Sequence, residues 1–198
     1  MDQIEAFILA GGVSSRMGSD KAQLLIAEQT LIQRIANTLF EVCDSVTVVG
    51  REVDNPRLKT ASDVYPKWGA LGGLHGALNA CASEWAFVIA CDLPFISAAM
   101  IKQLANFRES YDAVVPIQPD DRAQPLSSFY RTVNCLQQAT QLIEAGKRRP
   151  LDLLDSVNTR WVPFSELSEL IDSQNFFLNI NTPEDYYEAT QRAAADKS

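Results

Sequence analysis

The chain has 198 residues, of which 46% are hydrophobic and 21% charged, and it carries a formal net charge of −8. This length and composition suit one well-buried domain spanning residues 1–198 and exclude a disordered chain. The acidic balance argues against a protein that binds nucleic acid or a membrane surface, because phosphate backbones and anionic lipids repel an acidic surface. A negatively charged substrate must therefore be met by local cations.

The sequence indicates neither a secreted nor a membrane protein. The four cysteines lack C-x-x-C spacing and fall within apolar patterns, which is typical of buried thiols in a reducing compartment. The single histidine, His75, has no second histidine with which to form a conventional metal site, so we expect it on a helix surface or in packing. Residues 1–5 do not resemble a signal peptide, and no segment is long enough to span a membrane. We therefore expect a cytoplasmic protein.

Apolar runs and helical patterns alternate along the first half of the chain. Thr30 and Gln33 form a capping box before apolar residues that repeat on one helical face. Ser97 is a predicted N-cap. The apolar runs are nearly continuous, as strands buried on both faces of a parallel sheet require. The predicted strands cover residues 6–10, 46–49, 86–90 and 113–117, and the predicted helices cover residues 31–43, 71–82 and 98–107. This order predicts a doubly wound, mostly parallel, Rossmann-like α/β sheet.

The second half is less regular. Residues 127–131 are predicted to form a strand that returns along the sheet, and residues 133–145 a helix. Residues 177–181 alternate apolar and polar side chains, which predicts a strand with Asn179 and Asn181 on one face. A last helix then begins with Thr182 as its N-cap.

The stretch at residues 7–21, F-I-L-A-G-G-V-S-S-R-M-G-S-D-K, is an apolar strand that breaks into a glycine-rich loop. Gly11 and Gly12 let backbone N–H groups approach a polyanion, and Arg16 and Lys21 add full positive charges. The spacing differs from that of a Walker A loop and from the dinucleotide pattern G-x-G-x-x-G. An ordinary glycine-rich turn is the alternative, but two cations in one loop of an acidic chain favour an anion site.

A doubly wound sheet binds its ligand outside the carboxyl ends of its strands. Gly50 and Arg51 follow the second predicted strand, and Asp92 follows the third. A carboxylate directly after an apolar strand is costly unless a cation faces it, which makes Mg²⁺ the natural partner of Asp92. The alternative role is a cap for the helix beginning near Ser97, from which Pro94 separates Asp92.

The loop at residues 9–21 resembles the signature of nucleotidyltransferases that activate sugars and cofactors, above all the molybdenum cofactor guanylyltransferases of the MobA family. The resemblance implies a fold of the nucleotide-diphospho-sugar transferase type. It also implies that the start of the loop contacts the nucleotide and that its lysine contacts phosphate, which assigns these roles to Leu9, Ala10, Gly11, Gly12 and Lys21.

Two further motifs match the same family. D-V-Y-P-K-W-G-A-L-G-G-L, beginning at Asp63, resembles D-x-x-P-x-x-G-P-L-x-G-L, whose Asp contacts the nucleotide, with Ala70 in place of the usual Pro. Its glycines are alternatively explained by a helix start packed closely on the sheet. C-D-L-P at residues 91–94 matches the Cys-Asp-x-Pro element that supplies the metal-binding carboxylate, which implies that role for Asp92.

Two segments resemble parts of the family that are associated with the pterin substrate. A-G-K-R-R at residues 145–149 implies this role for Arg148 and Arg149, although cations also suit the C-terminal end of a helix. N-I-N-T-P-E-D at residues 179–185 implies the same role, association with the pterin, for Asn179 and Asn181. Helix capping explains the residues that follow them.

The resemblance thus implies Mg²⁺-dependent transfer of GMP from GTP to molybdopterin or its metal-loaded form, with release of pyrophosphate. Asp92 would hold the metal, Arg16 and Lys21 would offset charge on the leaving group, and other cofactor-assembly proteins are expected partners. Gly50 stands where family members often carry Asn near the guanine or ribose. A cytidylyltransferase for the same cofactor and a sugar-phosphate nucleotidyltransferase therefore stay open, as does a non-enzymatic chaperone that binds GTP and holds the cofactor.

Overall fold

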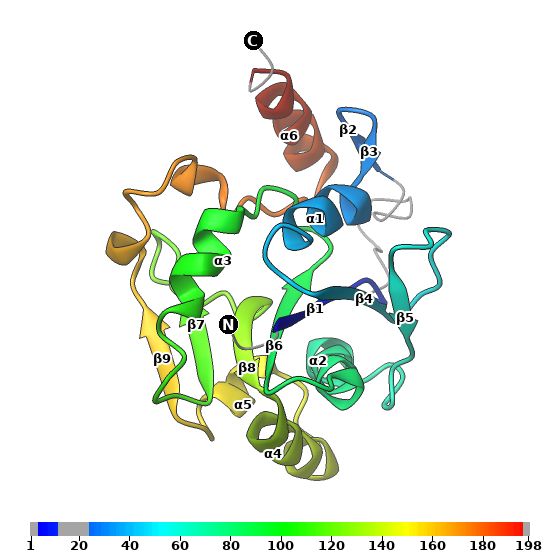
Figure 1. Ribbon diagram of the computed structural model, residues 1–198, viewed down its shortest axis with the longest axis vertical. Coiled ribbons are helices and arrows are strands. Elements are labelled where there is room, and N and C mark those ends of the chain that lie inside the picture. The colour runs from blue at the N-terminus through cyan, green and yellow to red at the C-terminus, as the bar shows by residue number, and fades with distance from the viewer. Residues whose placement is uncertain (1–3, 12–23, 196–198) are drawn as a thin grey trace.

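The computed structural model of the chain describes residues 4–11 and 24–195. A seven-stranded sheet with the order β5-β4-β1-β6-β8-β7-β9 forms its centre (Figure 1). β8 runs antiparallel to its two neighbours, and the other pairs are parallel. The strands are β1 (Ile4–Leu9), β4 (Ser45–Val49), β5 (Lys59–Ala61), β6 (Trp85–Ala90), β7 (Ala113–Pro116), β8 (Ser127–Arg131) and β9 (Thr159–Val162). The mostly parallel α/β sheet is confirmed.

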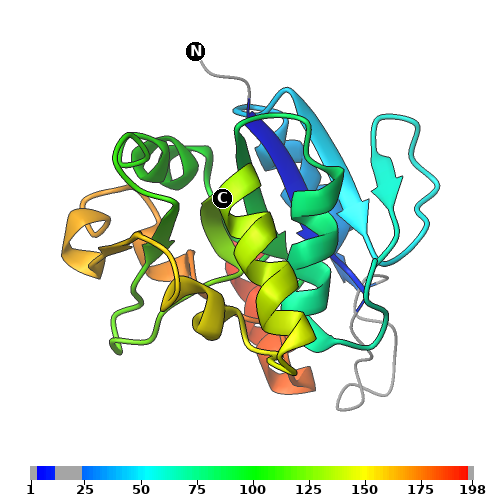
Figure 2. The same ribbon diagram turned by 90° about the horizontal axis from the view of Figure 1, so that it is seen from below.

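Helices cover both faces of the sheet because its strands are apolar on both sides. In β6, Phe87 and Ile89 pack into one buried cluster, whereas Ala86 and Val88 pack into another. The first cluster is completed by α1 (Leu31–Leu39) and α3 (Ala98–Ala105), and the second by α2 (Gly69–Ala80), α4 (Thr132–Glu144) and α5 (Pro150–Leu154). Figure 2 shows α2 and α4 side by side on the second face.

The predicted caps of the first-face helices are confirmed. The Gln33 amide N–H donates to Thr30 Oγ1 over 3.1 Å, and the Thr30 N–H donates to Gln33 Oε1 over 2.9 Å. The Met100 N–H donates to Ser97 Oγ over 3.1 Å. Because Ser97 caps α3, the capping alternative for Asp92 is wrong. α1 ends at Leu39, earlier than predicted, and residues 40–43 leave it in a turn.

A smaller apolar cluster lies beside the main body, where α6 (Pro183–Ala195) packs near the hairpin of β2 (Leu25–Ile26) and β3 (Gln29–Thr30) (Figure 1). Ile26, Phe95 and Ile180 meet in this cluster with the inner face of α6. The Tyr186 hydroxyl donates to the carbonyl oxygen of Leu25 over 2.7 Å, which joins the helix to the hairpin.

The strand predicted at residues 177–181 is wrong. These residues form irregular chain after two 3-10 turns, η2 (Phe164–Glu166) and η3 (Ser173–Asn175). The backbone N–H groups of Asn181 and Thr182 both donate to Asp185 Oδ2 over 2.8 Å, so they are taken by the start of α6 and not by a neighbouring strand. The alternating pattern arises because Leu178 and Ile180 pack into the smaller cluster.

The four cysteines form no disulfide, and Cys43 and Cys135 are buried as predicted. Burial raises the pKa of each of these two thiols to about 12. None of the helices in residues 4–11 and 24–195 is long and apolar enough to cross a membrane.

His75 is a packing residue of α2, as one of the two sequence-based alternatives predicted. The residue is 4% exposed, and its ring packs edge-on against Tyr65 and places Nε2 3.0 Å from Thr140 Oγ1. The Thr140 hydroxyl donates its one hydrogen to the carbonyl oxygen of Leu136, so Nε2 must carry the shared proton. Nδ1 then has no partner within the described part of the chain, and burial lowers the pKa of the ring below 6.5.

We expect His75→Gln to flatten the pH dependence of stability below pH 6.5. The unfolded chain binds a proton at His75 as the pH falls through 6.5, whereas the lowered pKa keeps the folded ring neutral, so the wild-type protein loses stability on acidification. Gln keeps a donor for Thr140 but does not titrate. Urea unfolding of both proteins at pH 7.5 and pH 5.5 measures the difference, and equal losses in the two proteins would contradict this role.

Candidate active site at the carboxyl edge of the sheet

The ends of β4, β1 and β6 are held side by side by hydrogen bonds that continue one residue beyond the strands. The Ala10 N–H donates to the carbonyl oxygen of Val49 over 3.0 Å, and the Cys91 N–H donates to that of Leu9 over 3.1 Å. The residues that follow these three strands therefore share one edge, where a sheet of this type binds its ligand.

Gly11 and Gly50 touch at this edge. A Cβ on Gly50 would lie 2.7 Å from the Cα of Gly11, and Gly50 has φ +88°, which favours glycine. Asp63 reaches the same place, because its Oδ2 lies 3.3 Å from the position of a Cβ on Gly11. The structure thus brings together three predicted nucleotide-binding residues that come from three separate segments.

The carboxylate of Asp63 is poised to accept hydrogen bonds. Its Oδ1 is sealed from solvent and has no hydrogen-bond partner among the described residues. Leaving a buried acceptor unpaired costs about 1–3 kcal/mol, and more for a charged group. The fold bears that cost beside Gly11, which the other oxygen of this carboxylate, Oδ2, faces.

The glycines of α2 support the packing interpretation made for this motif. A Cβ on Gly72 would lie 2.8 Å from Trp68 Cβ and 2.9 Å from the carbonyl oxygen of Tyr65. Gly72 is therefore required for the turn to pack against the helix start. That turn delivers Asp63 to the sheet edge.

Asp92 directly follows β6 and is half-buried. Its carbonyl oxygen accepts a hydrogen bond from the Ile180 N–H over 3.0 Å. Among residues 4–11 and 24–195, no three His, Cys, Asp or Glu side chains are grouped so as to hold a metal ion on their own. Mg²⁺ is usually held by one or two carboxylates together with substrate phosphates, so the chemistry of Asp92 fits a metal shared with a nucleotide.

Asn179 lies next to the end of β6, because the backbone of Ile180 is bonded to that of Asp92. Asn179 Oδ1 is sealed from solvent and lacks a partner within the described ranges. Asn181 is half-buried on the other side of Ile180, where its N–H is held by Asp185. The structure therefore places both asparagines close to Asp92, although not on a strand.

The turn that contains Arg148 and Arg149 packs against the start of α2. The Trp68 Nε1–H donates to the carbonyl oxygen of Lys147 over 2.7 Å, and the Arg148 guanidinium lies 4.5 Å from the centre of the Trp68 ring. Arg149 forms an exposed ion pair with Asp152 at 3.0 Å. Both arginines reach solvent near this edge. The contacts with Trp68 and Asp152 are enough to explain where the two side chains lie, without a substrate.

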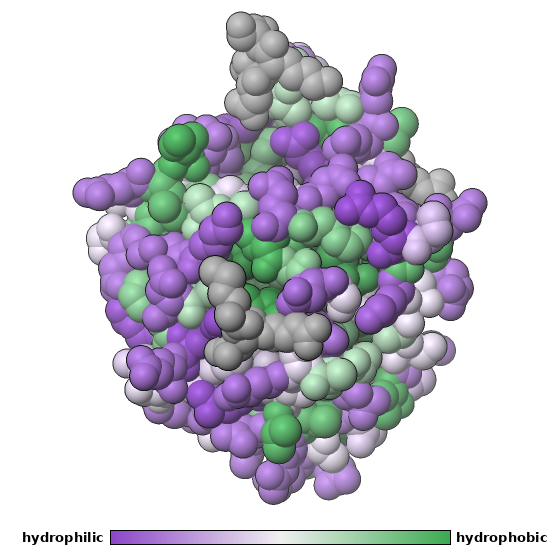
Figure 3. Space-filling view, in the orientation of Figure 1, coloured by the Kyte–Doolittle hydropathy of each residue, from purple (hydrophilic) through white to green (hydrophobic). Residues whose placement is uncertain are grey.

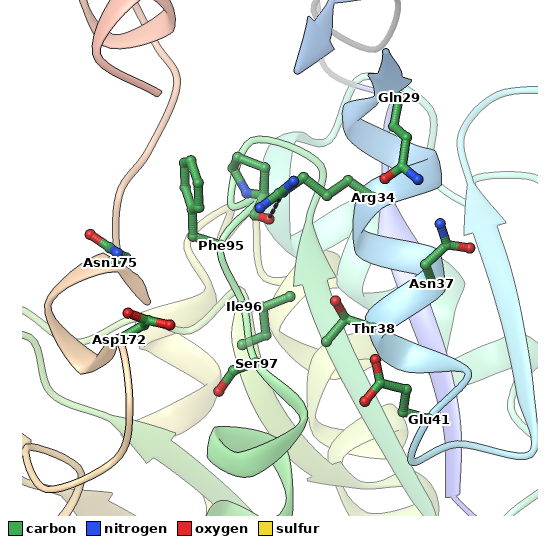
Figure 4. A pocket seen from close by; sticks show the side chains of 11 residues that line it. Gln29, Arg34, Asn37, Thr38, Glu41, Phe95, Ile96, Ser97, Asp172 and Asn175 are labelled. Carbon is green, nitrogen blue, oxygen red and sulfur yellow. Dashed lines mark hydrogen bonds between the residues drawn. The ribbon is translucent and has the colours of Figure 1, made fainter. Parts of the chain in front are cut away.

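A groove of about 350 Å³ lies behind the loop that follows Asp92, between α1 and residues 172–175 (Figure 4). Figure 3 shows apolar side chains between α1 and α3 on a largely hydrophilic face. Arg34 crosses the groove to donate from Nε to the carbonyl oxygen of Pro94 over 3.0 Å, and its guanidinium lies 5.1 Å from the centre of the Phe95 ring. Arg34 thus fixes the loop that positions Asp92, a role that its place on a helix face did not reveal in the sequence.

Gly12, Arg16 and Lys21 lie outside the described residues. Their predicted contacts with the nucleotide and its phosphates stay predictions. Gln124 lies at the same edge and was not predicted, because a single glutamine has no spacing pattern that marks it.

Comparisons with known proteins agree with this arrangement. A family model described as the MobA-like NTP transferase domain matches residues 6–159. A probable molybdenum cofactor guanylyltransferase of Pelotomaculum thermopropionicum is 33% identical over 201 residues, which cover 100% of this chain and 96% of the relative. A molybdenum cofactor guanylyltransferase of Desulfosudis oleivorans is 29% identical, with 96% of this chain and 95% of the relative covered.

Solved structures show the same fold. Molybdopterin-guanine dinucleotide biosynthesis protein A of Archaeoglobus fulgidus matches with a TM-score of 0.82 at 23% identity, covering 96% of this chain and 99% of that one. A 2-C-methyl-D-erythritol 4-phosphate cytidylyltransferase of Thermus thermophilus matches with a TM-score of 0.70 at 16% identity, covering 97% and 99%. The predicted class of enzyme, a nucleotidyltransferase, is confirmed. The chain belongs to the MobA-like NTP transferase family.

Proposed function

We propose that the chain acts as one nucleotidyltransferase domain and transfers GMP from GTP to molybdopterin or its metal-loaded form, with release of pyrophosphate. Relatives with that name cover nearly the whole chain. The observation that carries the choice of GTP is the unpaired Asp63 carboxylate beside Gly11 and Gly50. Guanine presents an N–H and an amino group side by side, and a carboxylate, which only accepts hydrogen bonds, can pair with both.

The reaction is an attack by the terminal phosphate of the pterin on the α-phosphorus of GTP. A bond forms between that phosphate oxygen and the α-phosphorus, and the bond from the α-phosphorus to the bridging oxygen of pyrophosphate breaks. The attacking phosphate is already ionised at neutral pH, so no protein base is needed. Positioning and charge stabilisation are then the work of the protein.

Each part of the edge has a proposed role in that work. The backbone at Leu9, Ala10 and Gly11 holds the nucleotide, and Asp92 holds Mg²⁺, which offsets phosphate charge when bound. Arg16 and Lys21 offset charge on the leaving pyrophosphate. The pterin acceptor is bound by Arg148, Arg149, Asn179 and Asn181.

We expect pyrophosphate from GTP alone when the protein is incubated with molybdopterin, Mg²⁺ and each of the four nucleoside triphosphates in turn. A coupled assay for pyrophosphate reads the result, and omission of molybdopterin is the control. Pyrophosphate from CTP would identify the cytidylyltransferase alternative instead. Binding of GTP without pyrophosphate in the complete mixture would identify the non-enzymatic chaperone.

A further inference from the structure

The loop between β7 and β8 brings a further side chain to the active edge. Because β8 is antiparallel to β6, its first residue lies beside the last part of that strand, with Ser127 opposite Ile89. The Ala90 N–H donates to the carbonyl oxygen of Leu126 over 3.0 Å. Residues 124–126 therefore lie beside Ala90, the last residue of β6. Ala90 precedes Asp92 by two residues in the chain.

Gln124 is buried in this loop without using its side chain. Only 8% of the residue is exposed. Its backbone N–H donates to the carbonyl oxygen of Pro116 over 2.9 Å, and its own carbonyl oxygen accepts from Ser128 Oγ over 2.8 Å. These bonds explain the course of the backbone, but the side-chain amide is bonded to nothing in the described part of the chain.

The amide of Gln124 keeps some contact with solvent. Unlike Asn179 Oδ1, its polar atoms are not sealed from solvent, although the residue as a whole is buried. Buried side-chain amides are normally paired, so an unpaired one at a sheet edge that binds ligands calls for an explanation. A ligand with both donors and acceptors would satisfy it, because an amide offers one acceptor and two donors.

The order of the strands places this amide on the acceptor side of the reaction. Asp63 lies over the ends of β4 and β1, Asp92 follows β6, and Gln124 precedes β8. In the sheet these strands are neighbours in the order β4-β1-β6-β8. Three strand spacings, roughly 14 Å, separate β4 from β8. Guanine at Asp63 and phosphates at Asp92 therefore leave the acceptor ring for the β8 side.

We propose that Gln124 binds the pterin ring of the acceptor by pairing its amide with the 2-amino-4-oxo edge of that ring, an inference that rests on the proposed function. The amide oxygen accepts from the ring N–H and from the 2-amino group beside it. Guanine and pterins share this edge. Guanine and the pterin ring thus present the same groups to two different side chains. The Asp63 carboxylate binds them on guanine, and the Gln124 amide binds them on the pterin at the opposite end of the site.

The test compares Gln124→Met, which keeps the length of the side chain, with Gln141→Met on the exposed surface of α4 as a matched control. In the guanylyl transfer assay, Gln124→Met is expected to raise KM for molybdopterin about tenfold or more and to leave KM for GTP within about twofold. The control is expected to change neither. An unchanged KM for molybdopterin in an active Gln124→Met protein would overturn the proposal while leaving the proposed function intact.

A binding measurement separates edge recognition from a structural role. Pterin and lumazine differ at position 2 of the ring, where lumazine has a carbonyl group in place of the amino group. Fluorescence titration is expected to show that the wild-type protein prefers pterin and that Gln124→Met loses this preference. A wild-type protein that binds the two compounds equally, or binds neither, would overturn the proposal. A wild-type protein that prefers pterin but forms no pyrophosphate would instead overturn the proposed function.

Discussion

Replacing Asp92 by Asn is expected to lower the rate of pyrophosphate release at saturating GTP by about a hundredfold or more. Asn has nearly the same size but no charge, so it holds Mg²⁺ poorly between the protein and the triphosphate. The concentration of Mg²⁺ needed for half-maximal rate should rise in parallel. Steady-state assays over a range of Mg²⁺ concentrations measure both effects.

The control for this substitution is Asp54→Asn, which removes an exposed carboxylate from the loop between β4 and β5. It lowers the net negative charge equally and should leave turnover unchanged. The Asp92 carbonyl that accepts from Ile180 is retained in Asp92→Asn, so a thermal melt can show that the sheet edge is intact. Near-normal turnover in a folded Asp92→Asn protein would exclude Asp92 as the metal ligand.

Gly50→Ala is expected to destabilise the protein and to raise KM for GTP. An alanine at φ +88° costs about 1–2 kcal/mol in backbone strain. Its Cβ would also lie 2.7 Å from Gly11 Cα, and overpacking of this kind costs about 1–3 kcal/mol more. Relief of the clash requires the ends of β1 and β4 to separate, which moves the backbone proposed to hold the nucleotide. Urea unfolding and KM measurements test the two effects.

Gly146→Ala isolates the steric part of that effect. Gly146 has a similar φ of +81°, but a Cβ there would meet nothing within 4 Å. This variant should therefore show only the cost of the backbone conformation and no change in KM for GTP. Equal losses of stability in the two variants would mean that the contact between Gly11 and Gly50 does not constrain the site.

The same contact explains why this chain departs from the family pattern at Gly50. The resemblance places Asn here in many members, but in this chain the approach of Gly11 leaves no room for a side chain. Under the proposed function, recognition of the base is then assigned to Asp63, whose Oδ1 is unpaired among the described residues. This division of roles follows from the packing of two strand ends and was not visible in the sequence.

Sequence patterns predicted the central strands better than the edge strands. β1, β4 and β6 are apolar on both faces, and each forms where its continuous apolar run lies. β5 and β9 were missed because each lies at an edge of the sheet with one neighbour, so partly exposed polar residues such as Lys59 and Thr159 interrupt the apolar pattern. Residues 177–181 show the opposite error, because a strand was predicted where none forms. Apolar and polar side chains alternate there because the apolar ones pack into the smaller cluster, without pairing to a neighbouring strand.

The candidate site was predictable where a motif follows a strand, and not where it depends on contacts between distant segments. Asp92 and Gly50 were found because each comes directly after an apolar run. The unpaired atoms of Asp63 and Asn179, in contrast, are properties of packing. Gln124 reaches the edge only because β8 runs antiparallel to β6, a direction that fixes which end of β8 lies beside Asp92.

The hydrogen bond from Ile180 to Asp92 has a consequence for the order in which the protein is completed during synthesis. Every strand of the sheet lies before residue 163. The loop after β6, however, bonds to Ile180, and Phe95 in that loop packs in a cluster with Ala189 and Ala193. A nascent chain therefore has all of its strands before the carboxylate proposed to bind Mg²⁺ is supported, and we expect the enzyme to become competent only after the segment that bears α6 has left the ribosome.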